Sequence, residues 1–439
     1  MREMKDSGIE WIGEIPKEWG VVRVKEKYKF NSGFTPETSH QEYYNDVDGY
    51  EWATISDLNN GKIDNPTKST ISREFVKFNH KKQIPSGCVL YSFKLTVGQV
   101  AVNDRPIFTN EAIMSFYPED ETNLNFFKYS ASLIEYSSNT NIYGAKILNQ
   151  QLISNAYIVY PPFQEQSRIA SFLDSKCSEI DSLHSDIEEE IETLKEYKKS
   201  VITEAVTKGL NPDTDMKDSG IEWIGEIPKE WDVNRLKYIF EFTKGLSITK
   251  ENLIEEGLPV ISYGQIHSKE NTGVDIKQTL LRYVSFDYLK NNRQSEVEQN
   301  SFVFADTSED YEGCGNFVYK RDDSLLYGGY HAIILHSIEK KDNRYFAYLF
   351  LTDLWRKQVR EIASGVKVFS ITQKNLMNCS VIIPKYDEQQ QIADYLDSKC
   401  FEIDSIIESK QQQLETLEQY KKSLIYEYVT GKKKVPYNA

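Results

Sequence analysis

Two short motifs in the sequence carry residue types that could do chemistry, and the first concerns methyl transfer. Tyr160-Pro161-Pro162-Phe163 has the outline of the (Asn/Asp)-Pro-Pro-(Tyr/Phe) pattern that holds a target amine for methylation. Tyr160 stands where that chemistry needs the polar side chain of Asn or Asp, and no glycine-rich turn that would cradle a nucleoside cofactor precedes it. We therefore interpret the two prolines as a stop before the next segment.

The second motif has the carboxylate-x-lysine spacing of metal-dependent nucleases and occurs twice, as Asp174-Ser175-Lys176 and Asp397-Ser398-Lys399. Both copies stand at the start of a segment with helical periodicity, where Asp and Lys are expected on the outer face. His331 and His336 lie in a strand-like stretch and would point to opposite faces, which does not make a metal site. The sequence therefore predicts no catalytic residue, no metal site and no cofactor bound by this chain.

Length and composition indicate a multidomain globular protein. The chain has 439 residues, of which 39% are hydrophobic and 27% charged; at about 150 residues per domain this length suggests about three domains. No apolar stretch is long enough to span a membrane, and the start of the sequence is polar and acidic, so we expect a cytoplasmic protein with no membrane partner. The five cysteines lie far apart without a CxxC pair, which argues against a disulfide framework.

The net charge of -15 is unusual for a protein that binds nucleic acid. The acidic residues are most concentrated within residues 161–210, where Asp186 to Glu190 form an acidic run. The overall charge therefore leaves room for local basic surfaces elsewhere.

The sequence contains a long internal repeat. Met4 to Trp19 recurs without a change as Met216 to Trp231, and the stretch from Glu165 to Ser200 recurs more loosely from Glu388 to Ser423. The predicted domains are therefore residues 1–160, a helix at 161–210, residues 211–384, a helix at 385–430 and a tail at 431–439.

The looser repeat has the periodicity of a coiled coil. Apolar residues recur every seventh position in both copies. We expect Leu183 and Tyr197 to fill neighbouring seam positions, and the ammonium of Lys410 to reach water or the acidic run. The seam residues are Leu173, Ile180, Ile187, Leu194 and Val201, and in the second copy Leu396, Ile403, Leu417 and Leu424.

The two blocks between the repeats are rich in aromatic and β-branched residues punctuated by Gly, Asn and Asp, as in residues 87–93 and 302–304. The predicted fold class is α+β: two mixed α/β domains separated by two long helices that form an antiparallel coiled coil, with a pseudo-two-fold internal repeat. The blocks share a plan but hardly any sequence, which suggests one scaffold carrying two different surfaces.

This order of motifs, repeated twice, resembles the specificity subunits of type I restriction-modification systems. The resemblance includes a Pro-x-x-Glu-Gln-x-x-Ile-Ala junction at residues 162–170 and a looser copy at 384–393 that has one extra residue. It implies a non-catalytic subunit with two target-recognition domains, each reading one half of a bipartite, asymmetric DNA sequence, with the coil setting the spacer. It also implies two methylation subunits and two restriction subunits as partners, which would carry S-adenosylmethionine, ATP and Mg.

Reading base edges needs mixed donor and acceptor side chains on a surface that enters a groove, with Lys or Arg near the phosphates. We expect such residues in the segment 91–99, in its surroundings and in the analogous loops of the second block, although each could equally be an ordinary polar loop. The DNA-binding candidates are Lys94, Thr96, Gln99, Asn110, Lys146, Tyr263, Gln265, His267, Thr307, Tyr330, His331 and Lys367.

The unchanged repeats should do the same job twice, either by anchoring each block to an end of the coil or by presenting a common face to a partner. Stacking of their tryptophans on bases is the less favoured interpretation. The partner-binding candidates are Trp11, Trp19, Trp223, Trp231, Leu173, Ile180, Leu396 and Ile403.

Two other functions stay open at this point. A non-enzymatic coiled-coil scaffold that holds two protein-binding domains would suit the acidic composition. A specificity protein fused to a methyltransferase is a more distant alternative, because the cofactor motif is missing.

Overall fold

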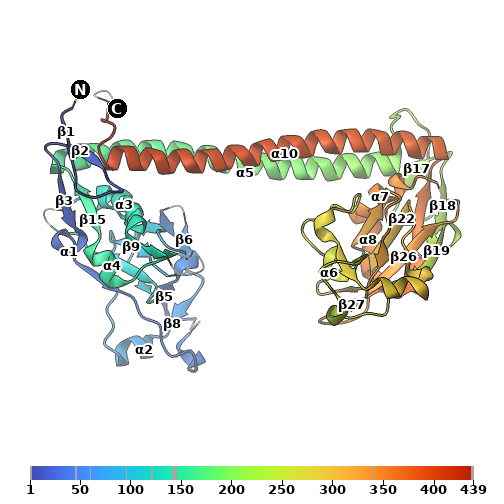
Figure 1. Ribbon diagram of the computed structural model, residues 1–439, viewed down its shortest axis with the longest axis horizontal. Helices are drawn as coiled ribbons and strands as arrows, with labels where there is room; N and C mark the ends of the chain where they lie inside the picture. Colours follow the sequence, from blue (N-terminus) through green and yellow to red (C-terminus); the bar gives the residue numbers. More distant parts are fainter. Residues whose placement is uncertain are drawn as a thin grey trace. The chain divides into compact units, whose positions relative to one another are not determined.

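The computed structural model describes residues 2–44, 47–59, 61–94, 96–119, 122–140, 146–339 and 341–436 (Figure 1). The chain forms two compact units. Unit 1 consists of Met1–Glu188 and Gln411–Ala439, and unit 2 of Glu189–Lys410. Each unit contains one mixed α/β domain and a part of each of two long helices, α5 (Phe163–Lys208) and α10 (Tyr386–Val429). No helix among the described residues is long and apolar enough to cross a membrane.

The domain of unit 1 is built on a four-stranded antiparallel sheet with the order β10-β9-β12-β4. Its central strands are buried on both faces. Helix α3 (Leu124–Ser132) covers one face of the sheet, where Phe127 joins the core. A three-stranded sheet, β11-β5-β8, completes the domain. The strands are β4 (Phe30–Ser32), β5 (Tyr50–Ala53), β8 (Thr70–Ile71), β9 (Val89–Ser92), β10 (Val100–Val102), β11 (Phe108–Thr109) and β12 (Ile113–Phe116).

The domain of unit 2 has the same topology. Its four-stranded sheet has the order β24-β22-β26-β19, and its three-stranded sheet the order β25-β20-β21, with a parallel central pair as in unit 1. The strands are β19 (Phe240–Lys244), β20 (Leu258–Ile261), β21 (Arg282–Val284), β22 (Ser301–Ala305), β24 (Phe317–Lys320), β25 (Tyr327–Gly328) and β26 (Ala332–Ser337), and helices α7 (Arg344–Leu351) and α8 (Asp353–Ile362) cover them. The predicted internal repeat and α+β class are confirmed.

Shorter elements connect these sheets. In unit 1 they are β1 (Met4–Asp6), β2 (Glu14–Pro16), β3 (Gly20–Arg23), α1 (Val24–Lys27), β6 (Leu58–Asn59), β7 (Lys62–Ile63), α2 (Arg73–Phe78), β13 (Asn139–Thr140), β14 (Lys146–Ile147), α4 (Gln150–Asn155) and β15 (Tyr157–Tyr160). In unit 2 they are β16 (Met216–Asp218), β17 (Glu226–Pro228), β18 (Asp232–Arg235), α6 (Tyr263–Ile266), β23 (Thr307–Ser308), β27 (Phe369–Ser370), α9 (Gln373–Met377) and β28 (Ser380–Ile383).

The long helices run antiparallel within each unit. In unit 1, Asp181 pairs with Lys421 at 2.5 Å and His184 lies 3.8 Å from Glu418, so the residue numbers rise along one helix as they fall along the other. In unit 2, Lys198 pairs with Asp404 at 2.7 Å. Lys410 pairs with Glu190, which confirms that its ammonium reaches the acidic run.

The seam of α5 differs from the predicted one at its alternate positions. Leu183 and Tyr197 are each 51% exposed, so their assignment to the seam was wrong. The residues that alternate with Leu173 and Ile180 are Cys177 and Ile191, both buried, together with the polar His184 and Lys198. The polar residues concealed the true four-three spacing, because a pattern based on apolar residues favours Leu and Tyr over His and Lys.

The junction between each domain and its helix is the same in both units. Gln166 Nε2 donates to the carbonyl of Pro161, and Gln389 Nε2 donates to the carbonyl of Pro384, each at 2.8 Å. Pro384 is therefore the counterpart of Pro161 rather than of Pro162. The extra residue in the second junction disappears with this alignment, and the prolines separate strand from helix as predicted.

Candidate nucleic-acid interface

Three segments of unit 2 bring most of the predicted DNA-binding side chains to one edge of the domain. Tyr263 begins helix α6, which follows β20; Thr307 follows β22; and Tyr330 and His331 connect β25 to β26. The ring centroid of Tyr263 lies 5.5 Å from that of Tyr330 and 5.4 Å from that of His331. Burial, with a smaller contribution from Tyr263, raises the pKa of Tyr330, so its hydroxyl stays protonated and can donate a hydrogen bond.

Asp306 organises the exposed part of this cluster. Thr307 Oγ1 donates to Asp306 Oδ1 at 2.7 Å, and His331 Nδ1 lies 2.9 Å from the same oxygen. The backbone of His331 is left-handed, with φ of 56°, which is uncommon for a residue other than Gly and is held by the contacts around it. The imidazole of His331 stands half exposed at this edge.

Two of the predicted contact residues have internal roles instead. His267 uses both ring nitrogens inside the domain, on the carbonyl of Thr307 at 2.8 Å and on Asn316 Nδ2 at 2.9 Å. Gln265 Oε1 accepts from the backbone N–H of Ser262 at 3.2 Å and so starts helix α6. A base edge would have to compete with these partners, so we assign both residues to the support of the cluster.

Lys367 lies in a protruding loop beside Thr307. Strand β27 pairs with β23, which places Ser370 opposite Thr307, and a bridge between Ser364 and Ser370 closes the loop. Lys367 is exposed, and the neighbouring Val366 is 92% exposed. This loop can therefore approach a phosphate next to the cluster.

In unit 1 the predicted residues gather at the turn between β9 and β10. Ser92 Oγ donates to the carbonyl of Thr96 at 2.5 Å and accepts from the N–H of Gln99 at 3.0 Å, which holds the turn. Lys94 Nζ lies 3.6 Å from Glu111 Oε1, and Glu111 follows Asn110 in the neighbouring turn. Lys94 and Asn110 are thus brought together, as predicted.

Gln99 and Lys146 differ from their neighbours. Gln99 Oε1 is buried and has no hydrogen-bond partner among the described residues, so a donor could reach it only after a shift of the turn. The side chain of Lys146 lies outside the described residues. Its backbone pairs with Thr140 in β13, which makes Lys146 the counterpart of Ser370 rather than of Lys367.

The two clusters occupy equivalent backbone positions. The N–H of Phe93 donates to the carbonyl of Ala112 at 3.0 Å, and the N–H of Asp306 donates to that of His331 at 3.1 Å. Lys94 is therefore the counterpart of Thr307. By the same comparison Asn110 and Glu111 correspond to Gly329 and Tyr330, because Asn110 and Gly329 each donate a backbone hydrogen bond to the preceding central strand. One scaffold thus carries different polar side chains at matching places.

The partner-binding candidates are mostly internal. The repeat hairpins β1–β2 and β16–β17 have identical register, and they bury Trp19 and Trp231. Trp11 and Trp223 are only partly buried. The prediction that all eight side chains contact a partner is corrected for six of them, because they are at most 6% exposed and pack within the chain itself: Trp19, Trp231, Leu173, Ile180, Leu396 and Ile403.

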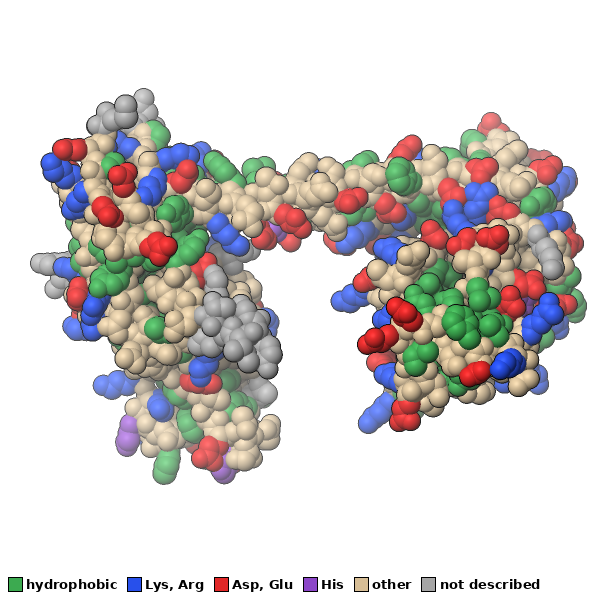
Figure 2. All heavy atoms as spheres, viewed as in Figure 1, with side chains coloured by type: hydrophobic (Ala, Val, Ile, Leu, Met, Phe, Trp, Pro, Cys, Tyr) green, Lys and Arg blue, Asp and Glu red, His purple; other side chains and the backbone are tan. Residues whose placement is uncertain are grey.

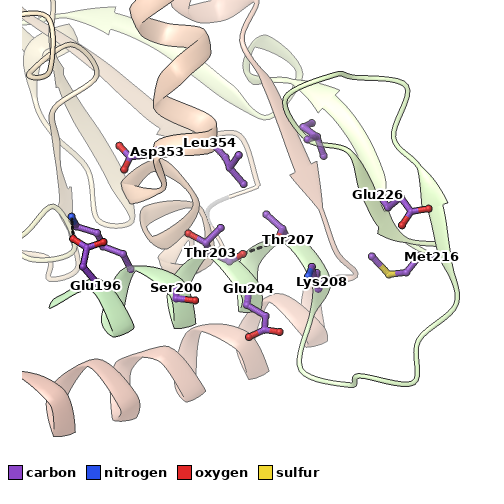
Figure 3. A pocket seen from close by; sticks show the side chains of 12 residues that line it. Glu196, Ser200, Thr203, Glu204, Thr207, Lys208, Met216, Glu226, Asp353 and Leu354 are labelled. Atoms are coloured by element: carbon purple, nitrogen blue, oxygen red, sulfur yellow. Dashed lines mark hydrogen bonds and ion pairs between the residues drawn. The ribbon is translucent and has the colours of Figure 1, made fainter. Parts of the chain in front are cut away.

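Unit 2 also has an open cleft of about 670 Å³ between the end of α5, the hairpin β16–β17 and α8 (Figure 3). Leu354 points toward Thr203 from α8, and Met216 and Glu226 come from the hairpin on the far side. The lining holds no Ser/His/Asp or Cys/His arrangement. Within the described ranges, no group of three or more His, Cys, Asp or Glu side chains could hold a metal ion.

Charge is mixed on the face of the molecule shown in Figure 2. Among the side chains drawn on the face shown in Figure 2, Lys and Arg alternate with Asp and Glu over each unit and form no continuous basic patch. The face shown therefore offers few phosphate contacts per unit area.

Known proteins resemble this chain in sequence and in fold. The chain is 25% identical over 430 residues to the type I restriction enzyme MjaVIII specificity subunit of Methanocaldococcus jannaschii, covering 96% of this chain and 94% of that protein. It is 22% identical to the EcoBI specificity subunit of Escherichia coli, covering 92% and 84%. A solved chain, described under complex assembly and conformational transition of the type I R-M system, has the same fold, with a TM-score of 0.68, 15% identity and coverage of 94% and 98%.

The model of the type I restriction modification DNA specificity domain matches the chain twice, at residues 16–193 and 228–419. These matches include most of both mixed α/β domains and most of both long helices. The chain therefore belongs to the family of type I restriction-modification specificity subunits.

Proposed function

We propose that each domain of this chain reads one half of a bipartite, asymmetric DNA target for a type I restriction-modification complex. The observation that carries the proposal is the equivalence of the two clusters, since Lys94 and Thr307 occupy the same backbone position with different side chains. Two readers of different half-sequences need this combination of a common frame and different polar groups.

In unit 2, Tyr330 supplies a hydroxyl donor, and Thr307 and His331 supply further polar groups for base edges. In unit 1, Lys94 and Asn110 have this role, and Gln99 joins them where a shift of the turn exposes its Oε1. Lys146 and Lys367 are assigned to phosphates. Each of these side chains can reach a groove only from the edge that the turns present.

The chain itself is proposed to be non-catalytic. Two methylation subunits would bind around the repeated regions and flip an adenine out of the stack, and two restriction subunits would join them for cleavage. S-adenosylmethionine, ATP and Mg would then be bound by those subunits in the cytoplasm. The purified chain should show neither methylation nor cleavage in the presence of all three.

An exchange of domains tests the proposal. Replacing residues 21–160 with the equivalent block of a relative should change one half of the methylated sequence and leave the other half intact, because base contacts specify locally. The measurement is a map of methylated sites in cells that carry the exchanged chain and its methylation partner. A change of both halves together would refute independent reading.

A salt titration separates this function from that of a protein scaffold, which the family membership does not favour. Binding of random duplex DNA to the chain alone, and to the chain with its methylation subunits, should weaken steeply as salt rises, because phosphate contacts release counterions. A scaffold for two protein-binding domains would show no such slope.

A further inference from the structure

A chain of hydrogen bonds connects a partly buried arginine of unit 2 to the edge that carries Thr307 and His331. Arg356, on helix α8, donates from Nη2 to Asn316 Oδ1. Asn316 Nδ2 lies 2.9 Å from His267 Nδ1, and His267 Nε2 lies 2.8 Å from the carbonyl oxygen of Thr307.

The two end groups of this series of hydrogen bonds, the Arg356 guanidinium and the Thr307 carbonyl, determine where every hydrogen in it lies. A guanidinium can only donate, so Asn316 must turn its oxygen toward Arg356 and its NH₂ toward His267. His267 Nδ1 must then accept, and the ring hydrogen is on Nε2, where it donates to Thr307. A carbonyl can only accept, so the far end requires the same arrangement. His267 is therefore held as one neutral tautomer, because a second ring proton would face the hydrogens of the Asn316 amide.

The opposite tautomer is required at His331. The Asp306 carboxylate accepts from Thr307 Oγ1, and His331 Nδ1 faces the same oxygen, so this nitrogen carries the hydrogen. In the neutral ring His331 Nε2 is then an acceptor at the other edge. Such an acceptor suits the exocyclic amino group of adenine or cytosine.

We propose that Arg356 and Asn316 are positioning residues for DNA reading by unit 2. They hold His267 as the Nε2–H tautomer and thereby hold the Thr307 backbone from inside, so that Thr307 and His331 present a fixed set of donors and acceptors. This role rests on the proposed function, and neither residue needs to touch DNA.

Neighbouring groups also restrict the positions of the residues in this series of hydrogen bonds. Arg356 Nη2 also donates to the carbonyl of Glu312 at 2.8 Å, which ties the loop before Asn316 to α8. At Gly313 a Cβ would lie 2.5 Å from Ser308 Oγ and 3.1 Å from His267 Nδ1, so a larger residue would require Ser308 and the imidazole to shift. The position of His267 is therefore set by packing as well as by hydrogen bonds.

Nitrogen NMR of the full chain, labelled with ¹⁵N-histidine, tests the hydrogen assignment, and His267→Gln identifies the signal. In the unmodified protein the signals of His267 should correspond to the Nε2–H tautomer and to no other. In Asn316→Asp both ring nitrogens face acceptors, so the shifts should change to those of a doubly protonated ring, while the introduced carboxylate keeps a partner in Arg356. In Arg356→Met the Thr307 carbonyl still requires the hydrogen on Nε2, so the tautomer should be kept, but the Asn316 amide loses the partner that holds it and the His267 signals should broaden. Arg356→Lys keeps an obligate donor and should keep them sharp.

Methylation of half-site variants by the chain with its methylation partner tests the consequence for reading. Arg356→Met should lose about tenfold in discrimination at the half-site of unit 2 and none at that of unit 1. Asn316→Asp keeps the bond from Nε2 to Thr307 and should keep its discrimination, which also guards against mere misfolding of the Met variant.

The proposal is overturned if Asn316→Asp leaves the imidazole of His267 neutral, or if Arg356→Met keeps full discrimination at the half-site of unit 2. If the unmodified complex fails to discriminate between DNA sequences at all, the proposed function fails, and the positioning role fails with it. If the unmodified complex discriminates between DNA sequences and the Arg356 and Asn316 variants discriminate equally well, only the positioning role is refuted.

Discussion

The hydroxyl of Tyr348 donates a hydrogen bond of 2.6 Å to the carboxylate of Asp397, and Tyr129 makes the same bond to Asp174 at 2.7 Å in the other unit. Each bond ties a helix of a mixed α/β domain to a long helix. The carboxylates belong to the two copies of the carboxylate-x-lysine motif. In both units the aspartate of the motif therefore holds the domain to its long helix. The sequence predicted only that this aspartate lies on the outer face of the helix.

The two copies differ in their cations, which leads to a first prediction. Asp397 also pairs with Arg321 at 2.6 Å and Arg344 at 2.7 Å and is mostly buried, whereas Asp174 pairs with Lys128 and is 42% exposed. Asp397→Asn should therefore lower the free energy of unfolding of unit 2 by about 2 kcal/mol, because Arg321 loses its carboxylate partner while Arg344 keeps Asp342 and Asp394. Asp174→Asn, the matched control, should cost unit 1 about 1 kcal/mol or less.

The same pair gives a dependence on pH. Burial pushes the pKa of Asp397 upward, but hydrogen bonds from Arg321, Tyr348 and Arg344 outweigh it, so the pKa lies below its ordinary value. The carboxylate therefore stabilises the fold fully above its unfolded pKa of about 4, and this contribution is lost as the pH falls through the lower, folded pKa. Denaturant unfolding at pH 7 and at pH 3 measures this loss. Between these two pH values the free energy of unfolding should fall less in Asp397→Asn than in the unmodified protein, and an equal fall would contradict the assignment.

The identical repeats contain a second matched pair, Trp19 and Trp231. Trp231 Nε1 donates to Glu388 Oε2 at 2.9 Å, whereas Trp19 Nε1 is buried without a partner among the described residues and Arg2 takes the corresponding Glu165 at 3.0 Å. Trp231→Phe removes a bond to a charged group and should cost about 1 to 3 kcal/mol more than Trp19→Phe. Thermal unfolding of the two variants measures the difference, and equal costs would mean that the bond to Glu388 contributes nothing.

The cleft of unit 2 has a filled counterpart in unit 1, which gives a third prediction. Tyr426, the repeat counterpart of Thr203, donates to the carbonyl of Trp11 at 2.9 Å, and Trp11 stacks on Tyr136 at 5.3 Å. Thr203→Tyr should place a ring in the cleft beside Trp223 and raise the free energy of unfolding by about 1 kcal/mol. Melting temperatures of Thr203→Tyr and of Thr193→Tyr, an exposed site on the same helix, provide the comparison; destabilisation at residue 203 beyond that at 193 would contradict it.

The sequence revealed the architecture because its repeats are explicit. Hairpins from identical residues fold identically, and apolar residues at every seventh position define two long helices. The seam was misassigned where His184 and Lys198 take core positions, since their polarity hides them from a hydrophobic pattern. The spacing of residues in the sequence cannot show which polar side chains find hydrogen-bond partners inside the domain.

The candidate site illustrates that last limit. Tyr263, Thr307, Tyr330 and His331 were found from their residue types, and the topology brings them together. His267 has the same residue type as His331, but Asn316 and Thr307 occupy both of its nitrogens. Arg356 escaped notice because it lies on a helix after the sheet, far along the chain from the cluster that it supports.

The last prediction concerns the length of the two long helices. Both are continuous across the boundary between the units, which falls after Glu188 in α5 and after Lys410 in α10. Adding seven residues at each of these two places keeps the heptad phase and lengthens the helix pair by about 10 Å. If the helices set the spacing of the half-sites, the preferred gap should grow by about three base pairs, at about 3.4 Å per step, while both half-sequences stay unchanged.

The insertion has to be made in both helices. An insertion near Thr207 in α5 alone would displace Val206, whose carbonyl accepts a hydrogen bond of 2.9 Å from Tyr345, and should disrupt unit 2 instead of moving the gap. Methylation mapping of the double-insertion variant decides between the alternatives. Full activity with an unaltered gap would show that the long helices hold the domains without determining how far apart the two half-sites lie.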